Sequence, residues 1–215
     1  MRRERLHALL TDSIEYDVTV IGTPAGFGKS TLAVDWCAES VLPAIWLSLD
    51  RGDWDPLALI ADLVGAVRQR FPVALDDLSQ RLMAGAAPNS AAALVAELAT
   101  TIQTDVDELA VLIVDGLHIL DDAPAALDVI DTLIRNVPMN LRVILLSRTF
   151  PTLPSLDRLQ NAVAQIGEIP ALPDPDQART GGVTLGRISG AFAEARLAAA
   201  AVLAAVEVQR RRAMV

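Results

Sequence analysis

Gly28, Lys29 and Ser30 form a short run whose residue types could hold a phosphate chain. Backbone N–H groups of a glycine turn, an ammonium group and a hydroxyl can together contact the β- and γ-phosphates of a nucleotide and its Mg²⁺ ion. Lys29 is the only lysine among the 18 lysine and arginine residues of the chain. A compact, flexible ammonium is thus kept where a phosphate would need it, and the run predicts phosphate binding.

The residues around this run follow the strand, turn and helix order of a P-loop. A β-branched strand over 17–22 leads into the turn, and a helical pattern begins at Ser30. The strict P-loop pattern has glycine at its first position, where this chain has Thr23, and Gly22 lies one residue earlier. Because the Gly-Lys-Ser end makes the phosphate and metal contacts, we still predict nucleotide binding; the alternative is a glycine-rich turn that binds nothing. The expected nucleotide-binding residues are Thr23, Pro24, Ala25, Gly26, Phe27, Gly28, Lys29, Ser30 and Thr31.

Polar residues also follow two other apolar runs. Asp115 comes after the run 109–114, and Arg148 comes after the run 142–147. Because ligands bind beyond the carboxyl ends of parallel strands, we expect Asp115 and Arg148 to meet the P-loop there. Ser30 and Asp115 are the expected Mg²⁺ ligands, and Asp115 and Arg148 are the expected catalytic residues, with Arg148 contacting the γ-phosphate. The alternatives are a strand-ending turn acid or helix cap for Asp115 and a surface arginine for Arg148.

For the other residues that could take part in chemistry, a structural role is the favoured interpretation. His118 could touch the site, but a neutral structural histidine is the preferred assignment. The acids Asp121 and Asp122 are interpreted as a helix cap with solvated charge. Packing rather than base stacking is expected of the tryptophans Trp36, Trp46 and Trp54.

Strands and helices that alternate along the chain must position these residues. Strands are predicted at 17–22, 44–49, 109–115, 142–147 and 162–169. Helices are predicted at 4–10, 30–39, 56–70, 76–84, 90–103, 124–136 and 153–159, with Asp55 and Pro56 opening the third. Continuous apolar strands separated by helices indicate an α/β fold with a parallel sheet covered on both faces.

Composition limits the classes of partner. The formal net charge is −9 over 215 residues and the pI is near 4.6, which argues against a surface that binds nucleic acid directly. The N-terminal residues lack the apolar segment of a signal peptide, and the longest late apolar run, 197–206, is too short to span a bilayer. The single cysteine, Cys37, cannot form an internal disulfide. We therefore expect a cytoplasmic chain whose partner is a nucleotide, with neither nucleic acid nor membrane bound directly.

Three parts of the chain differ in composition. Residues 1–169 hold the motifs and form the predicted P-loop domain, 170–182 are a linker rich in proline and glycine, and 183–215 are a predicted alanine-rich C-terminal helix of unknown role. The alanine-rich face of that helix supports an alternative function. In this alternative the chain is a degenerate P-loop interaction module that uses the helix for self-association or for binding a protein partner.

Four ordered motifs resemble the STAND class of P-loop NTPases, in particular the ATPase domains of the maltose-regulon activator and of large ATP-binding LuxR-type regulators. The motifs lie at 23–31, 44–56, 112–118 and 146–153, and the resemblance covers about residues 1–169. It implies an ASCE-type P-loop NTPase, which is a three-layer α/β sandwich with a parallel five-stranded sheet in the order 5-1-4-3-2. It also implies ATP/ADP exchange coupled to activation and self-association in a signalling or transcription regulator, with Arg148 as the arginine that senses phosphate.

One departure from the family pattern concerns catalysis. The family usually carries two acids at the end of the third strand, whereas Asp115 is followed here by Gly116. Because the second acid would help to activate water, we expect ATP and Mg²⁺ binding with slow or absent hydrolysis, at most a slow Mg²⁺-dependent ATPase. A faster ATPase would need another group to position the water, and the sequence does not identify that group. A small residue at the position of Thr23 is acceptable in the family.

Overall fold

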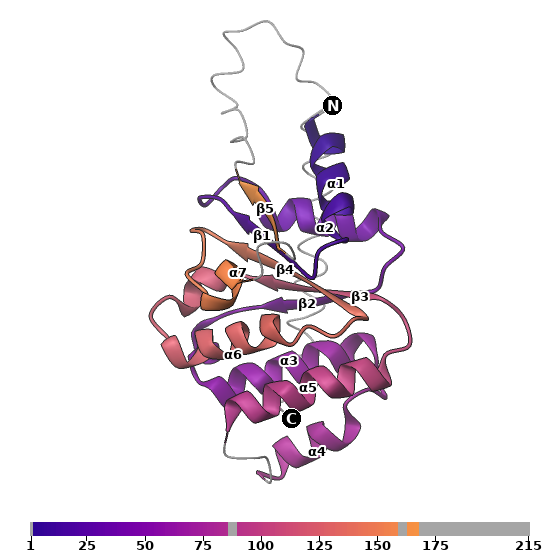
Figure 1. The fold of residues 1–215 in the computed structure, drawn as a ribbon, viewed down its shortest axis with the longest axis vertical. Helices are drawn as coiled ribbons and strands as arrows, with labels where there is room; N and C mark the ends of the chain where they lie inside the picture. The colour runs from indigo at the N-terminus through magenta and orange to yellow at the C-terminus, as the bar shows by residue number, and fades with distance from the viewer. Residues whose placement is uncertain (1, 86–89, 159–162, 168–215) are drawn as a thin grey trace, which may run out of the picture.

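A computed structural model describes residues 2–85, 90–158 and 163–167 of the protein (Figure 1). At its centre is a parallel sheet in which β2, β3, β4, β1 and β5 lie side by side in that order. The strands are β1 (Val18–Gly22), β2 (Ala44–Ser48), β3 (Ala110–Asp115), β4 (Leu141–Ser147) and β5 (Val163–Gly167). The predicted α/β fold with a parallel sheet is confirmed. The predicted linker 170–182 and C-terminal helix 183–215 lie outside the described residues, as do both ends of the predicted strand 162–169.

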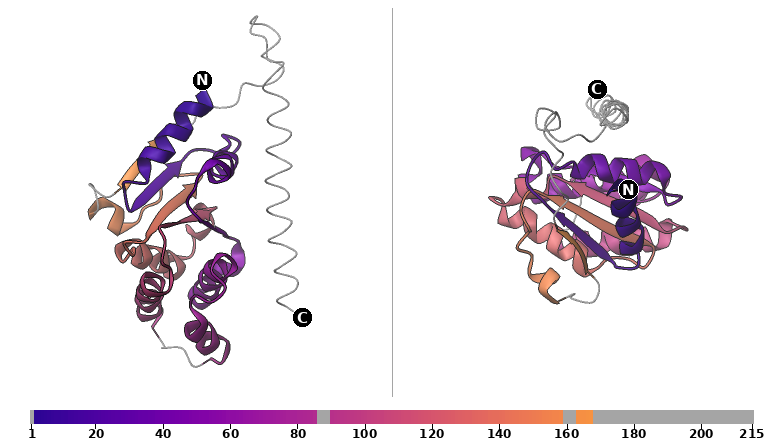
Figure 2. Two further views of the ribbon diagram at one scale, coloured as in Figure 1. Left: turned by 90° about the vertical axis from the view of Figure 1, so that its right-hand side faces the viewer. Right: turned by 90° about the horizontal axis from the view of Figure 1, so that it is seen from above.

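Helices cover both faces of the sheet (Figure 2). One face carries α1 (Arg2–Ser13) and α2 (Lys29–Glu39), and the other carries α3 (Pro56–Arg70), α5 (Ala91–Asp105) and α6 (Pro124–Arg135). The shorter helices α4 (Asp76–Met83) and α7 (Pro154–Arg158) pack against α3 and α6, and two 3-10 turns, η1 (Arg51–Trp54) and η2 (Leu117–Leu120), follow β2 and β3. Within the described ranges, no helix combines the length and the apolar character needed to cross a membrane.

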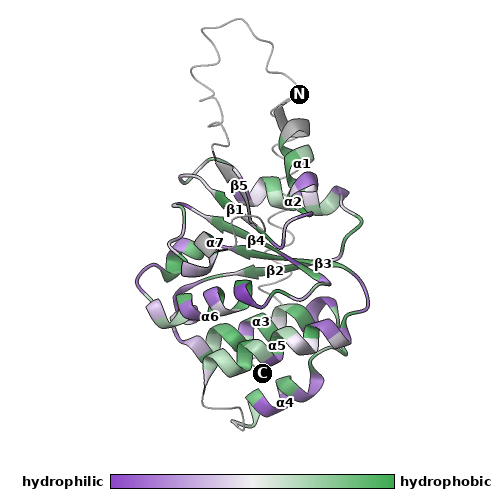
Figure 3. Cartoon of the chain, in the orientation of Figure 1, coloured by the Kyte–Doolittle hydropathy of each residue, from purple (hydrophilic) through white to green (hydrophobic). Residues whose placement is uncertain are grey.

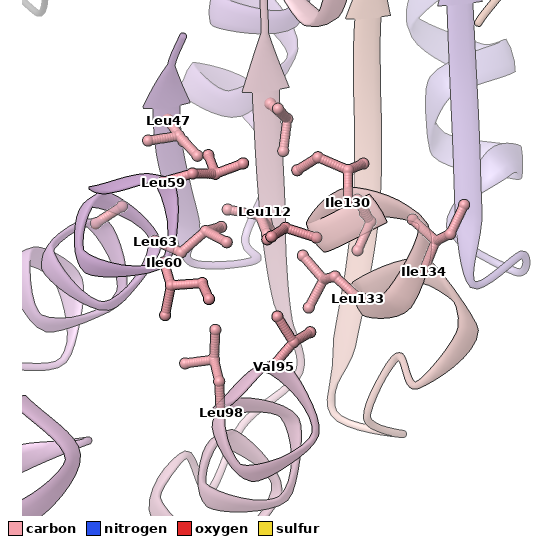
Figure 4. Packing of buried hydrophobic residues seen from close by; sticks show 14 of the residues in the cluster. Leu47, Leu59, Ile60, Leu63, Val95, Leu98, Leu112, Ile130, Leu133 and Ile134 are labelled. Carbon is pink, nitrogen blue, oxygen red and sulfur yellow. The ribbon is translucent and has the colours of Figure 1, made fainter. Parts of the chain in front are cut away.

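Strand β3 shows how the two cores are filled. Val111 and Ile113 belong to the apolar cluster under α2, which also contains Trp36. Leu112 and Val114 belong to the larger cluster under α3, α5 and α6 (Figure 4). Because side chains alternate along a strand, a continuous apolar run is what a strand buried on both faces requires. Figure 3 shows the same apolar character along the strands of the sheet.

The helix starts follow the capping signals only in part. The Asp55 carboxylate accepts hydrogen bonds from the backbone of Leu57 and Ala58, at 2.8 and 3.0 Å, and so begins α3 as predicted. The predicted cap of α6 by Asp121 or Asp122 is wrong, because Ala123 occupies the cap position and Asp121 ends η2. The first helix was also predicted too short. It continues to Ser13, whose hydroxyl donates to the carbonyl of Leu10 within the helix, at 2.7 Å.

Backbone pairing brings the carboxyl ends of the central strands to one edge. Gly22 pairs with Ser147 and Ser48 pairs with Asp115. The pairing continues into the loops, where Leu49 N donates to Asp115 O at 2.9 Å and Thr23 N donates to Ser147 O at 3.2 Å. The residues that follow β1, β2, β3 and β4 are therefore held next to one another by the sheet itself.

Candidate nucleotide-binding site

A cleft of about 1120 Å³ lies at this edge of the sheet. It is partly open to solvent and is lined by the P-loop and by residues that follow β2, β3 and β4. Of the predicted site residues, those that line it are Ala25, Gly26, Gly28, Lys29, Ser30, Thr31, Asp115 and Arg148. The structure thus brings together the three strand-end features that the sequence analysis placed at one edge.

The P-loop has the backbone shape that its glycines predict. Gly26 and Gly28 have φ of +84° and +77°, in the left-handed region that side chains other than glycine adopt at a cost of about 1 kcal/mol or more. A β-carbon built at either glycine meets no atom within 4 Å, so open space faces both. Gly28 occupies the cap position of α2 without a side chain, and the first turn of this helix lines the cleft. Free N–H groups and the helix dipole at such a terminus favour an anion.

The Lys29 ammonium is held inside its own loop. Its Nζ donates to the carbonyl oxygens of Thr23 and Pro24, at 2.5 and 3.0 Å, and the residue is only 9% exposed. Burial lowers the pKa of Lys29, and the charge of Arg148 lowers it further, whereas the charge of Asp115 raises it. A cation held by two neutral carbonyls in a buried place would gain from a phosphate partner.

Ser30 and Asp115 bring two oxygen groups of the kind that Mg²⁺ uses to the same cleft. They come from the first turn of α2 and from the end of β3. Burial raises the pKa of Asp115, and the Ser30 hydrogen bond and the Lys29 charge oppose that rise. In the described part of the chain, His, Cys, Asp and Glu form no metal-binding group of three or more. The donor set suits an ion that uses few protein oxygens and takes its other ligands from phosphates and water.

Arg148 and His118 also line the cleft. Arg148 is exposed, and its charge lowers the pKa of both Lys29 and His118. For His118 the larger cause of the lowered pKa is burial. Its Nδ1 is buried without a hydrogen-bond partner among the described protein atoms. His118 lines the cleft, as the alternative to the favoured structural interpretation proposed.

Three of the predicted nucleotide-binding residues do not line the cleft. Thr23 is 2% exposed and lies beneath the loop, where its carbonyl and that of Pro24 hold Lys29. Phe27 packs against the apolar cluster that contains Trp36. These side chains support the loop, because its open surface is formed by the glycines and by the first turn of α2.

The sequence analysis missed Asp50, Arg51 and Trp54, which line the cleft from the end of β2 and from η1. The packing interpretation is wrong for Trp54, which is 41% exposed and whose Nε1 donates to Ile119 O of η2 at 2.8 Å. The packing interpretation is confirmed for Trp36, which is 4% exposed. The sequence does place Asp50 directly after the predicted second strand, much as Asp115 ends the third. This position indicates a site residue only if the two strands are known to be neighbours in the sheet.

Asp53 is a buried acid that holds η1 in place. Its Oδ2 accepts a hydrogen bond from Asp50 N at 2.6 Å, and the Asp50 carboxylate in turn accepts one from Gly52 N at 2.6 Å. Asp53 is 1% exposed, and its burial, opposed by the hydrogen bond from Asp50 and reinforced by the charges of Asp62 and Asp50, raises its pKa to about 6. The folded protein therefore binds a proton at Asp53 more tightly than the unfolded chain does.

Replacing Asp53 by asparagine should flatten the dependence of stability on pH. Because the folded-state pKa is raised, the contribution of Asp53 is fully present below pH 4 and is lost as pH rises from about 4 to about 6. At pH 8 we expect the free energy of unfolding of Asp53→Asn to be about 1–2 kcal/mol higher than that of the wild type, so that the variant is more stable. At pH 4 we expect little difference between the two proteins. Urea unfolding at both pH values measures this, with the exposed Asp55→Asn as control; an equal gain at pH 4 would refute the titration argument.

Comparisons with known proteins identify relatives of the chain. No family model matches the chain. The chain is 30% identical over 169 residues to the HTH-type transcriptional regulator MalT of Klebsiella pneumoniae subsp. pneumoniae and 34% identical over 159 residues to MalT of Serratia proteamaculans. These alignments cover 77% and 70% of this chain but 18% and 16% of the relatives. Among solved structures, the Aeropyrum pernix ORC1 protein has a similar fold, with a TM-score of 0.50 and 16% identity over 98% of this chain and 60% of that one.

The resemblance recognised from the motifs is confirmed by these relatives. The chain carries a STAND-like P-loop domain similar to the corresponding part of the MalT regulators. It spans less than a fifth of the length of those regulators.

Proposed function

We propose that this STAND-like P-loop domain binds ATP and ADP together with Mg²⁺ and serves as the nucleotide switch of a signalling or transcription regulator. The observation that carries the proposal is the convergence of Lys29, Ser30, Asp115 and Arg148 on one open cleft. A glycine-rich turn without a ligand would not need a buried ammonium beside a metal-type oxygen pair. The strand order at the centre of the sheet supports the ASCE type. A domain boundary near residue 169 is part of the proposal.

Each of these residues has a distinct task in the proposal. The backbone N–H groups of the loop and of the first turn of α2 bind the phosphates, and Lys29 exchanges its two carbonyl partners for phosphate oxygens. Ser30 and Asp115 would hold Mg²⁺, which when bound neutralises charge on the phosphates. Arg148 contacts the γ-phosphate, so its position differs between ATP and ADP.

The segment after Arg148 offers a route from the nucleotide to the rest of the protein. It leads within a few residues to α7, which is fixed on α6 by the buried carboxylate of Asp131. Ser155 of α7 donates to Asp131 from its backbone N at 2.8 Å and from its hydroxyl at 2.9 Å. A shift of Arg148 between the ATP and ADP states therefore acts on a helix that directly precedes β5 and the remainder of the chain. Coupling of nucleotide state to a regulator is proposed on this basis and on the similarity to MalT.

Calorimetry with ATP, ADP and GTP, each with and without Mg²⁺, tests the proposal. ATP and ADP should bind with saturation, GTP should bind more weakly, and removal of Mg²⁺ should weaken ATP binding about tenfold or more. Asp115→Asn should lose most of this dependence on Mg²⁺ because it removes the charged ligand. Folded wild-type protein that binds none of the three nucleotides would overturn the proposed function.

A further inference from the structure

The backbone at the end of β3 disfavours a second acid beside Asp115. Gly116 has φ of +89°, in the left-handed region, and a β-carbon there would lie 3.2 Å from Ile119 Cδ1 and 3.6 Å from Leu49 O. The glycine is required by the sharp turn from β3 into η2. A group that positions water for ATP hydrolysis must therefore come from another element.

Among the described residues, two further carboxylates line the cleft, those of Asp50 and Asp122. Asp50 follows β2, the strand next to β3, and its neighbour Leu49 donates from N to Asp115 O at 2.9 Å. The Asp50 carboxylate is also held in place, because its Oδ1 accepts from Gly52 N at 2.6 Å and its own N donates to Asp53 Oδ2 at 2.6 Å. Asp122 lies in the exposed turn that follows η2. Asp50 is thus the carboxylate fixed directly to the strand beside the expected metal ligand.

We propose that Asp50 is the catalytic acid–base residue that positions the attacking water, an inference that rests on the proposed ATP site. Along the sheet edge the P-loop follows β1, Arg148 follows β4, Asp115 ends β3 and Asp50 follows β2. Phosphoryl transfer needs the attacking and leaving oxygens on opposite sides of the γ-phosphorus. In the proposed complex the leaving oxygen faces the P-loop and the attacking water lies toward the end of β2, which is one strand spacing of roughly 5 Å beyond β3.

The chemical step is then a simple hydrolysis. The water oxygen forms a bond to the γ-phosphorus as the bond from that phosphorus to the β,γ-bridging oxygen breaks. The electron pair of the broken bond stays on ADP, and one water proton passes to the Asp50 carboxylate and from there to solvent. ADP and inorganic phosphate are the products, and Asp50 returns to its ionised form.

The test compares ATP binding with phosphate release for Asp50→Asn in the full chain. Asparagine caps a turn about as well as aspartate, so η1 should be retained, and thermal unfolding by circular dichroism checks this. With Mg²⁺ and ATP we expect single-turnover phosphate release to fall about 100-fold while the Kd for ATP changes about twofold or less. Asp50→Glu, which keeps the charge, should recover part of the rate. Asp122→Asn tests the other carboxylate of the cleft and should lose much less rate than Asp50→Asn. Asp55→Asn, a change of the same type at an exposed acid outside the cleft lining, should release phosphate at the wild-type rate.

Several results would overturn the role of Asp50. They are an unchanged rate in Asp50→Asn, an equal loss in Asp122→Asn, or a loss of ATP affinity as large as the loss of rate. Wild-type protein that binds ATP and releases no phosphate would also overturn it while leaving the proposed switch intact. Absence of ATP binding by the wild type, in contrast, is the separate failure of the proposed function itself.

Discussion

Replacing Lys29 by alanine is expected to weaken ATP binding by about 100-fold or more, because charge-assisted contacts to the β- and γ-phosphates are removed from a buried place. The ligand-free protein should lose little stability. The Lys29 ammonium is almost buried, and this burial lowers its pKa. The variant loses two hydrogen bonds to loop carbonyls, but it also no longer has to remove a charged group from water, and the two effects oppose each other. Calorimetry for ATP and urea unfolding without ligand measure the two effects separately. A folded Lys29→Ala protein with wild-type affinity would contradict the assignment.

The composition of the chain allows an independent control at Lys29. It is the only lysine, so an amine-directed acylating reagent can modify only this side chain and the N-terminal amine. ATP with Mg²⁺ should protect Lys29 and leave the N-terminal amine as reactive as before, which mass spectrometry of the two peptides reports. Equal acylation of Lys29 with and without ATP would show that nucleotide does not cover it.

Replacing Asp131 by alanine is expected to lower the free energy of unfolding by about 3 kcal/mol. Asp131 is 5% exposed and accepts hydrogen bonds from Ser155 N, from Ser155 Oγ and from Arg135, at 2.8, 2.9 and 2.8 Å. Removing it leaves the buried donors of Ser155 without a charged acceptor, and buried donors without partners are costly. Urea unfolding followed by circular dichroism measures the loss.

Arg135→Ala is the matched control for Asp131→Ala. The Arg135 side chain is 56% exposed and makes an ion pair one helical turn away from Asp131. Such a pair contributes about 0.5 kcal/mol or less, so this variant should unfold close to wild type. If both variants lost the same stability, the ion pair rather than the contact between α6 and α7 would be the source. That result would also weaken the proposed route from Arg148 through α7.

Most of the candidate site could be predicted because its signals are local in sequence. Glycines at 26 and 28 predict a left-handed loop, and Lys29 with Ser30 predicts the phosphate and metal contacts within a few residues. Helix α3 was also predictable, because Asp55 and Pro56 are a capping residue and a first-turn residue. The structure corrected the end of the first helix, which is predicted at residue 10 and lies at Ser13. Turn-forming residues can remain helical when a side chain bonds to the preceding turn, as Ser13 does.

Asp50 and Trp54 could not be assigned to the site from sequence because their meaning depends on distant partners. Asp50 gains its position from the pairing of β2 with β3, between segments more than 60 residues apart. Trp54 reaches the cleft through its hydrogen bond to Ile119, which lies 65 residues further along the chain. Residue propensities and spacings within a short window do not predict which distant segments pair, since many strand orders satisfy the same local pattern.

The sequence by itself determined the phosphate-binding loop, the alternation of strands and helices, and the acid and arginine that follow β3 and β4. These depend on backbone preferences and side-chain chemistry within a few residues. Only the tertiary structure showed that the end of β2 brings the Asp50 carboxylate to the same cleft. The left-handed backbone at Gly116 makes a side chain strained directly after Asp115, while the register of β2 against β3 places another carboxylate at the same edge.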